Sequence, residues 1–130
     1  MIILPLKNIL KTIRSVLKQS FNKFEYIIVD GGSKDGTLSI IQSYSQSIYK
    51  IISEKDNGMY DALNKGIKKS NGKVIGILHS DDTFSDKTVI SSIVKTFVIS
   101  KVDLIWGDVI FVDNKMKVRR LYSGADISPL

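Results

Sequence analysis

Apolar residues recur along this 130-residue chain with two alternating periods, and this alternation restricts the folds open to it. Short apolar runs that end at polar or glycine-rich turns predict buried strands, whereas apolar residues three and four positions apart predict amphipathic helices. We expect strands at residues 2–4, 24–29, 48–52, 74–78, 104–112 and 116–121. We expect helices at residues 9–17 (with Asn8 as N-cap), at 38–44, at 59–67 (closed by Asn71 and Gly72) and from Asp86 to about residue 98. Alternating strands and helices predict an α/β fold, a mostly parallel sheet with helices on both faces that ends in a hairpin.

Composition favours one globular domain. The chain is 43% apolar and 25% charged and has no cysteine, so disordered, collagen-like and disulfide-stapled classes fit poorly. We expect a domain over residues 1–122, followed by a tail or cut end at 123–130. No apolar run is long enough to cross a bilayer. The lack of cysteine fits a reducing compartment, and we expect a cytoplasmic location, with attachment to the inner face of the membrane left open.

Acidic residues follow two of the expected strands. Asp30 comes directly after the second strand, and Asp81 and Asp82 come after the fourth. Ligands of open α/β sheets bind beyond the carboxyl ends of the strands, so these carboxylates would share one edge of a parallel sheet. A divalent cation relieves their repulsion, and Mg²⁺ is usually held by one or two carboxylates together with phosphate oxygens. The alternative is that each acidic group only forms a turn, a common role of aspartate.

Two further polar segments are ambiguous when read alone. Residues 31–37 resemble a phosphate-binding loop, but Thr37 stands where that loop needs lysine. The interpretation that is left for residues 31–37 is a flexible turn before a helix N-terminus, and such a terminus can bind an anion. Residues 56–66 form a polar segment after the third strand, in which Asn64 shares part of the helix face that meets the sheet edge. Lys65 either reaches a diphosphate or is a solvated helix lysine.

A net charge of +6, from 19 basic and 13 acidic residues, favours an anionic partner. A basic stripe on the first expected helix is made of Lys7, Lys11, Arg14 and Lys18. Such a stripe either lies on an acidic membrane surface or is the solvated face of the helix. The basic residues of the final hairpin lack interleaved aromatic side chains, so no nucleic-acid partner is expected. The single histidine, His79, excludes zinc sites built on several histidines or cysteines.

Three segments occur in an order and at separations typical of a known family. They are IIVDGGSKDGT at residues 27–37, SEKDNGMYDALNKG at 53–66 and GILHSDD at 76–82. Together they resemble the family 2 glycosyltransferases of the GT-A fold, a Rossmann-like nucleotide-diphospho-sugar transferase fold of inverting enzymes that build bacterial surface polysaccharides. Residues 4–8 look like the opening strand and loop of that family, and residues 105–109 look like a later strand of its polysaccharide-building branch.

The resemblance implies a nucleotide site. Asp30 would contact the base or ribose of the nucleotide, and Pro5 and Asn8 would line the same pocket. Gly31 belongs to this site but replaces a frequent second aspartate, so the base that is read stays open. Lys7 stands where the family often has an aromatic residue that packs near the base.

The resemblance also implies a metal and a donor sugar. Asp81 and Asp82 match the Asp-x-Asp-type motif that holds Mg²⁺ or Mn²⁺ against the donor diphosphate, although His79 occupies the first place of the pattern. Asp56 and Asn64 would border the donor site.

The implied function is metal-dependent transfer, with inversion, of a sugar from a UDP- or GDP-linked donor to a saccharide or lipid-linked acceptor in cell-surface polysaccharide synthesis. The chain is short for this family, and neither Asp108 nor Asp113 lies where its catalytic base is expected, so no base is assigned. Two alternatives stay open: a truncated nucleotide-binding or interaction module without turnover, and a small Mg²⁺-dependent phosphate-handling domain. Self-association is also open.

Overall fold

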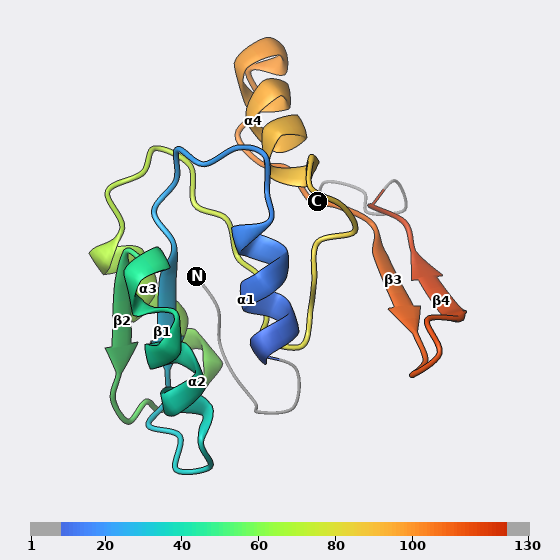
Figure 1. The fold of residues 1–130 in the computed structure, drawn as a ribbon. Helices are drawn as coiled ribbons and strands as arrows, with labels where there is room; N and C mark the ends of the chain where they lie inside the picture. Colours follow the sequence, from blue (N-terminus) through green and yellow to red (C-terminus); the bar gives the residue numbers. More distant parts are fainter. Residues whose placement is uncertain (1–8, 125–130) are drawn as a thin grey trace. The chain divides into compact units, whose positions relative to one another are not determined.

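A computed structural model describes residues 9–124 of the chain, which divides into two compact units, residues 1–92 and 93–130. Each unit is described by itself. The first contains α1 (Ile9–Leu17), β1 (Ile27–Asp30), α2 (Thr37–Ser43), the 3₁₀ helix η1 (Ser45–Ser47), β2 (Lys50–Ser53) and α3 (Met59–Lys69) (Figure 1). Helix α4 (Val89–Ser100) begins in the first unit and continues into the second, which also holds β3 (Val109–Val112) and β4 (Val118–Tyr122).

The expected parallel sheet is represented by β1 and β2. These strands pair in parallel, with Ile27 opposite Lys50 and Asp30 opposite Ser53. The backbone ladder continues past the strand end, where the amide of Glu54 donates to the carbonyl of Asp30 at 3.0 Å. All four residues of β1 are buried, as expected for an inner strand of a parallel sheet covered on both faces.

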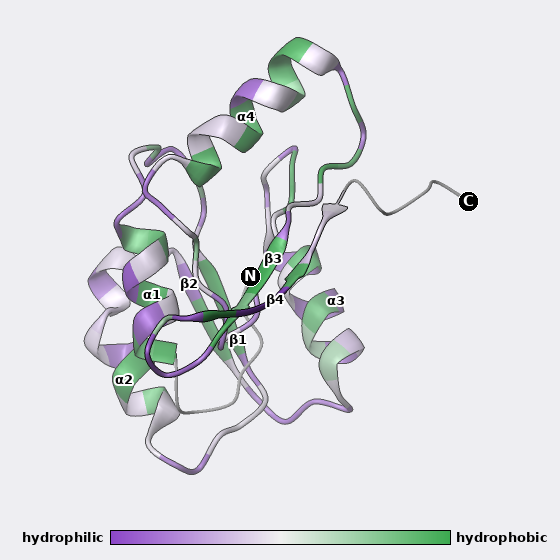
Figure 2. Cartoon of the chain, turned by 90° about the vertical axis from the view of Figure 1, so that its right-hand side faces the viewer, coloured by the Kyte–Doolittle hydropathy of each residue, from purple (hydrophilic) through white to green (hydrophobic). Residues whose placement is uncertain are grey.

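Helices cover both faces of β1, which confirms the predicted layering. On one face Ile28 belongs to a buried cluster with Ile13 of α1 and Ile41 of α2. On the other face Ile27 and Val29 pack with Ala62 of α3. Helix α1 meets the sheet as an amphipathic helix, with hydrophobic and hydrophilic residues along separate stripes (Figure 2).

Residues 74–78, predicted as a strand, are not assigned to a strand among the described residues 9–124, and their pairing stays a prediction. Val74, Ile75 and Ile77 are about half exposed, and only Leu78 packs against the core. In the doubly wound order, a strand formed by residues 2–4 would lie between β1 and this segment. Residues 2–4 lie outside the described residues, so within residues 9–124 this segment has no strand to pair with.

The second unit contains the predicted hairpin. Strands β3 and β4 pair antiparallel, with Ile110 opposite Leu121 and an irregularity between Phe111 and Val112. The first strand, Val109–Val112, is shorter than the predicted range 104–112, and two side chains just before it contact Gly124. The Trp106 indole donates to the carbonyl of Gly124 at 2.7 Å, and the Asp108 carboxylate accepts the Gly124 amide at 2.7 Å.

Two predicted helix ends shift for local reasons. The predicted start at Asp86 is wrong: its carboxylate accepts the Thr88 amide at 2.7 Å in a turn, and α4 begins at Val89. Helix α3 ends at Lys69, and Asn71 instead donates its amide to the Glu25 carboxylate at 2.9 Å. Among the described residues no helix has the length and apolarity that crossing a membrane requires. The predicted tail, residues 123–130, falls mostly outside the described residues, and its boundary stays a prediction.

Candidate functional site

Asp30 ends β1 and is completely buried. Its carboxylate accepts hydrogen bonds from the Ser33 amide (3.1 Å to Oδ2), from the Ser33 hydroxyl (2.5 Å to Oδ1) and from the Ser53 hydroxyl (2.6 Å to Oδ2). Ser53 reaches Asp30 because the parallel register places the two residues side by side. Burial by itself would raise the pKa of Asp30, but the hydrogen bonds from Ser33 and Ser53 outweigh burial and lower the pKa. Asp30 is therefore a buried carboxylate that stays ionised.

The glycine turn after β1 brings Asp56 against Gly31. A Cβ atom at Gly31 would lie 2.6 Å from Oδ2 of Asp56, and the other oxygen, Oδ1, accepts the Gly58 amide at 2.9 Å. Gly32 has a φ of +84°, the left-handed conformation that favours glycine. The carboxyl ends of β1 and β2 therefore unite three of the predicted site residues, Asp30, Gly31 and Asp56.

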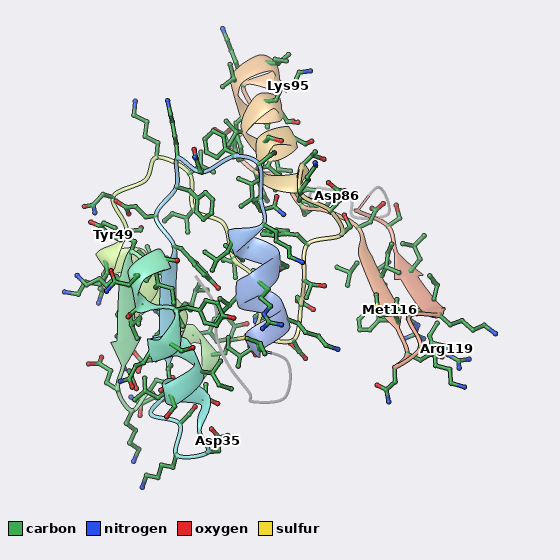
Figure 3. All side chains as sticks on the ribbon, viewed as in Figure 1. Asp35, Tyr49, Asp86, Lys95, Met116 and Arg119 are labelled. Carbon is green, nitrogen blue, oxygen red and sulfur yellow. The ribbon has the colours of Figure 1, made fainter. Side chains whose placement is uncertain are left out.

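The rest of the 31–37 loop prepares the start of α2. The Asp35 carboxylate accepts the hydroxyl of Thr37 at 2.8 Å and its amide at 3.3 Å. Figure 3 shows Asp35 at the tip of this loop. Asp35 acts here as a turn and helix-start residue.

Helix α3 is fastened to the loop after β2 by Lys65. Its Nζ donates to the Lys55 carbonyl at 2.8 Å and lies 3.2 Å from the Glu54 carboxylate and 3.4 Å from that of Asp61. Lys65, predicted either to reach a diphosphate or to be a solvated helix lysine, instead joins α3 to the loop after β2 in this structure. Asn64, on the same helix, is exposed, and no hydrogen bond joins it to Asp30, Gly31 or Asp56.

Asp81 and Asp82 lie in an exposed turn that is held in place by contacts with α1. The amide of Asp82 donates to the His79 carbonyl at 3.1 Å, and the buried Thr12 hydroxyl contacts the carbonyls of Ser80 and Asp82. Partial burial raises the pKa of Asp82, the neighbouring Asp81 carboxylate raises it further, and His79 offsets part of the rise. In Figure 1 this turn and the carboxyl end of β1 both lie at the end of the first unit where α1 begins.

Sequence reasoning missed a polar stripe on α1 and just beyond it. Its side chains form hydrogen bonds with residues 80–90. Its members are Thr12, Ser15 and Gln19, at i, i+3 and i+7, a spacing that could have indicated one face of the helix. Besides the Thr12 contacts, the Ser15 hydroxyl accepts the Phe84 amide (3.3 Å), and the Gln19 side chain donates to the Asp86 carbonyl (2.7 Å) and accepts the Ile90 amide (3.0 Å).

The donor set at 81–82 fits a hard divalent cation. Burial, and after it the neighbouring Asp81 carboxylate, raises the pKa of Asp82, and a bound cation would offset the repulsion between the two carboxylates. Within residues 9–124 no group of three or more aspartate, glutamate, histidine or cysteine side chains is placed to hold a metal. Mg²⁺ and Mn²⁺ sites of the predicted kind need only two protein carboxylates when phosphate oxygens complete the coordination.

The remaining site predictions are not reached by the described structure. Pro5 and Asn8 lie outside the described residues. A hollow of about 310 Å³ lies elsewhere in the first unit, lined by residues that include Phe21, Tyr26 and Tyr49 and by none of the predicted site residues.

Comparison with known proteins decides the family. Residues 6–128 match the family described as Glycosyl transferase family 2. The chain belongs to this family. It is 33% identical over 99 residues to an uncharacterized glycosyltransferase of Mycobacterium tuberculosis, covering 75% of this chain and 38% of the relative. It is also 33% identical over 101 residues to a PGL/p-HBAD biosynthesis glycosyltransferase of Mycobacterium bovis, covering 74% and 39%. The chain thus spans less than two fifths of the length of these glycosyl transferase family 2 relatives.

Solved structures confirm the GT-A fold for this family 2 chain. TarS of S. aureus matches with a TM-score of 0.62 and 27% identity, over 73% of this chain and 19% of TarS. The mannosyltransferase PcManGT of Pyrobaculum calidifontis, solved with GDP-Man and Mn²⁺, matches with a TM-score of 0.67 and 20% identity, over 87% of this chain and 34% of PcManGT. The predicted α/β class and the predicted family are therefore both confirmed.

Proposed function

We propose that this chain binds a nucleoside-diphosphate sugar and is the donor-binding part of an inverting, metal-dependent glycosyltransferase of cell-surface polysaccharide synthesis. The observation that carries the proposal is the meeting of Asp30, Gly31 and Asp56 at the carboxyl ends of β1 and β2, in a chain whose residues 6–128 match glycosyl transferase family 2. Ligands of parallel α/β sheets bind at that edge.

The donor class is supported by the structural neighbours. TarS was solved with UDP-GlcNAc, and PcManGT was solved with GDP-Man and Mn²⁺. For this chain we propose a UDP- or GDP-linked sugar as donor and a saccharide or lipid-linked molecule as acceptor. A cytoplasmic location, at the inner face of the membrane or away from it, belongs to the same proposal.

Each predicted residue takes a role in this proposal. Asp30, Gly31 and Asp56 form the nucleotide end of the site, and Asn64 borders the sugar. Asp81 and Asp82 hold Mg²⁺ or Mn²⁺, which when bound stabilises the negative charge of the departing diphosphate. Pro5 and Asn8 remain predicted members of the nucleotide pocket.

The transfer itself needs a base. The acceptor hydroxyl attacks the anomeric carbon, the bond from that carbon to the diphosphate oxygen breaks, and a carboxylate takes the hydroxyl proton. Asp108 and Asp113 are engaged otherwise: Asp108 accepts the Gly124 amide, and Asp113 pairs with Arg119 at 2.7 Å. We therefore assign neither of them as the base.

Calorimetric titration tests the proposal. UDP, GDP, UDP-GlcNAc and GDP-mannose are titrated with Mn²⁺ and again with EDTA, and inorganic pyrophosphate serves as the ligand without a nucleoside. We expect metal-dependent binding of at least one nucleotide. Equal binding of pyrophosphate would favour the phosphate-handling alternative, and no binding of any nucleotide would contradict the proposal.

Variants locate the metal. Asp81→Asn and Asp82→Asn should each weaken nucleotide binding in Mn²⁺ and leave the melting temperature near that of the wild type, because both carboxylates are exposed. Lys11→Glu, on the basic stripe, should leave nucleotide affinity unchanged. Unchanged affinity in both aspartate variants would contradict the metal assignment.

A second candidate is a binding module without turnover. It is favoured by the engagement of Asp108 with Gly124 and of Asp113 with Arg119, which leaves no catalytic base assigned among residues 9–124. Release of free sugar or of nucleoside diphosphate from the donor separates the two candidates. Metal-dependent binding without any release, with saccharide and lipid-linked acceptors present, would favour the module.

A further inference from the structure

We propose that Asp56, and not Asp30, is the carboxylate that contacts the nucleoside of the donor, and that Gly31 is a glycine because it makes room for Asp56. This inference rests on the proposed function and assigns the residue that determines specificity within that site.

Asp30 is not available to a ligand. It is completely buried, and both of its carboxylate oxygens already accept hydrogen bonds from Ser33 and Ser53. A carboxylate offers about four acceptor positions, and three donors from the protein already fill most of them. Asp30 is therefore a positioning residue: it joins the end of β1 to the end of β2 and fixes the turn that begins at Gly31.

Asp56 has the opposite properties. It is only partly buried, and only its Oδ1 is committed, to the Gly58 amide at 2.9 Å. Its Oδ2 lies over Gly31, 2.6 Å from the place where a Cβ would stand. Within residues 9–124 no protein donor binds this Oδ2, so this oxygen can accept a hydrogen bond from a ligand.

The contact explains why residue 31 is glycine. Gly32, Gly36 and Gly58 have positive φ angles of 84°, 88° and 107°, and a side chain at those positions would strain the backbone. Gly31 is not among the residues with positive φ. The Asp56 carboxylate occupies the volume where a residue-31 side chain would begin, so a side chain at this position would displace that carboxylate. One carboxylate, supplied by the loop after β2, thus takes the place that an aspartate at position 31 would use.

The chemistry of this oxygen limits its ligand. An ionised carboxylate only accepts hydrogen bonds and repels phosphate oxygens, so it faces a hydrogen-bond donor. In a nucleoside-diphosphate sugar the nucleoside supplies such donors as the ribose hydroxyls and the N–H groups of the base. The nucleoside end of the donor therefore lies at Asp56, away from the predicted metal at Asp81 and Asp82.

Calorimetry with Mn²⁺ and whichever of UDP and GDP binds the wild type tests this assignment. We expect Asp56→Asn to weaken binding about tenfold or more, the usual effect of losing a hydrogen bond to a charged group. Glu54→Gln is the matched control, since it removes one exposed negative charge from the same loop. We expect that variant to bind within twofold of the wild type and both variants to melt with the wild type.

A double-mutant cycle tests the role of Gly31. Gly31→Ala should weaken nucleotide binding, because its Cβ displaces the Asp56 carboxylate. In an Asp56→Gly background the same Gly31→Ala change should cost no further affinity, because the obstructing carboxylate is absent. Equal losses of nucleotide affinity from Gly31→Ala in both backgrounds would contradict the proposal that a Cβ at residue 31 and the Asp56 carboxylate compete for the same space.

Nucleotide analogues identify the donor group. If the Asp56→Asn penalty disappears with the 2′-deoxy nucleotide, the ribose hydroxyl is the partner; if it persists, the partner is a base N–H, and either result supports the assignment. Asp56→Asn binding like the wild type, or losing no more than Glu54→Gln, would overturn it, as would a loss confined to Asp30→Asn without a change in melting temperature. A wild type that binds neither nucleotide would instead overturn the proposed function, and this inference with it.

Discussion

At the scale of single residues, the ionisation of the buried Asp30 carboxylate contributes to the stability of the fold. The hydrogen bonds from Ser33 and Ser53 lower its pKa below the ordinary value of 3.8. A group whose pKa is lower in the folded state stabilises that state above its unfolded pKa, and this contribution is lost as the pH falls through the folded pKa. Asp30→Asn should therefore lower the free energy of unfolding at pH 7 by about 1–3 kcal/mol.

The pH dependence provides the control for this prediction. Urea unfolding at pH 7 and at successively lower pH should show the difference between Asp30→Asn and the wild type shrinking below the ordinary pKa of aspartate. Ser53→Ala should reproduce part of the loss at pH 7, because it removes one donor to Oδ2. A penalty for Asp30→Asn that does not change with pH would show that ionisation of Asp30 does not contribute to stability.

Tyr26 carries a buried polar atom without a partner. Its hydroxyl finds no hydrogen-bond partner within the described part of the chain, and burial raises the pKa of this phenol. A buried, unsatisfied hydroxyl costs free energy that its removal recovers. Tyr26→Phe should raise the free energy of unfolding by about 1 kcal/mol, measured by chemical denaturation. A lower stability of the variant would mean that the hydroxyl is satisfied in solution.

That Asp30, Gly31 and Asp56 lie at one sheet edge could be predicted from sequence, but their contacts could not. The motif at residues 27–37 and the polar segment at 56–66 were enough to select Asp30, Gly31 and Asp56. The sharing of space between Gly31 and Asp56 depends on the register that sets Asp30 opposite Ser53, and no local pattern encodes that register. The hydrogen bond from the Ser53 hydroxyl to Asp30 joins residues 23 positions apart and could not be predicted for the same reason.

At the scale of elements, α1 positions the turn that carries the predicted metal ligands. The buried Thr12 hydroxyl contacts the carbonyls on both sides of Asp81, at Ser80 and Asp82. Thr12→Val keeps the shape of the side chain and removes this donor. We expect it to weaken Mn²⁺-dependent UDP or GDP binding severalfold, and Thr12→Ser to restore it, because only the hydroxyl is needed.

Affinity in EDTA separates positioning from general damage. If Thr12 acts through the 80–82 turn, the Thr12→Val loss appears with Mn²⁺ and not with EDTA. An equal loss in both conditions would indicate that α1 supports the whole nucleotide site. Calorimetry on the same three proteins measures both cases.

Helices were predicted more accurately than strands, and the reason is physical. The period of α1, α2 and α3 is set within each segment, by apolar residues three and four apart that face one core. A strand exists only if another strand pairs with it. For the apolar run at residues 74–78 the predicted neighbour, residues 2–4, lies outside the described residues, so this strand stays a prediction. Residues 104–108 lie next to Gly124, which Trp106 and Asp108 contact with their side chains, and the register of the hairpin would pair most of this segment with residues outside the described range.

At the scale of the whole molecule, family membership and fold agree, and within the second unit the hairpin exposes several large apolar side chains. Successive side chains of a strand point to opposite faces of the hairpin. All four residues of β3 are apolar, so both faces of the hairpin carry apolar side chains. The exposed fractions are 52% for Ile110, 50% for Phe111 and 58% for Leu121. Isolated two-stranded hairpins are marginally stable, and large exposed apolar patches commonly mark contact surfaces.

We therefore expect the 130-residue chain to self-associate through this hairpin. Sedimentation velocity across a hundredfold range of concentration should show association that persists at high salt, because apolar contacts are not screened. The double variant Ile110→Lys with Leu121→Lys, which charges one face of the hairpin, should shift the chain to the monomer. Lys95→Glu, on exposed α4, is the control for a change of charge alone. Association that disappears at high salt in the wild type would instead assign it to the basic residues, because high salt screens charge interactions and leaves apolar contacts intact.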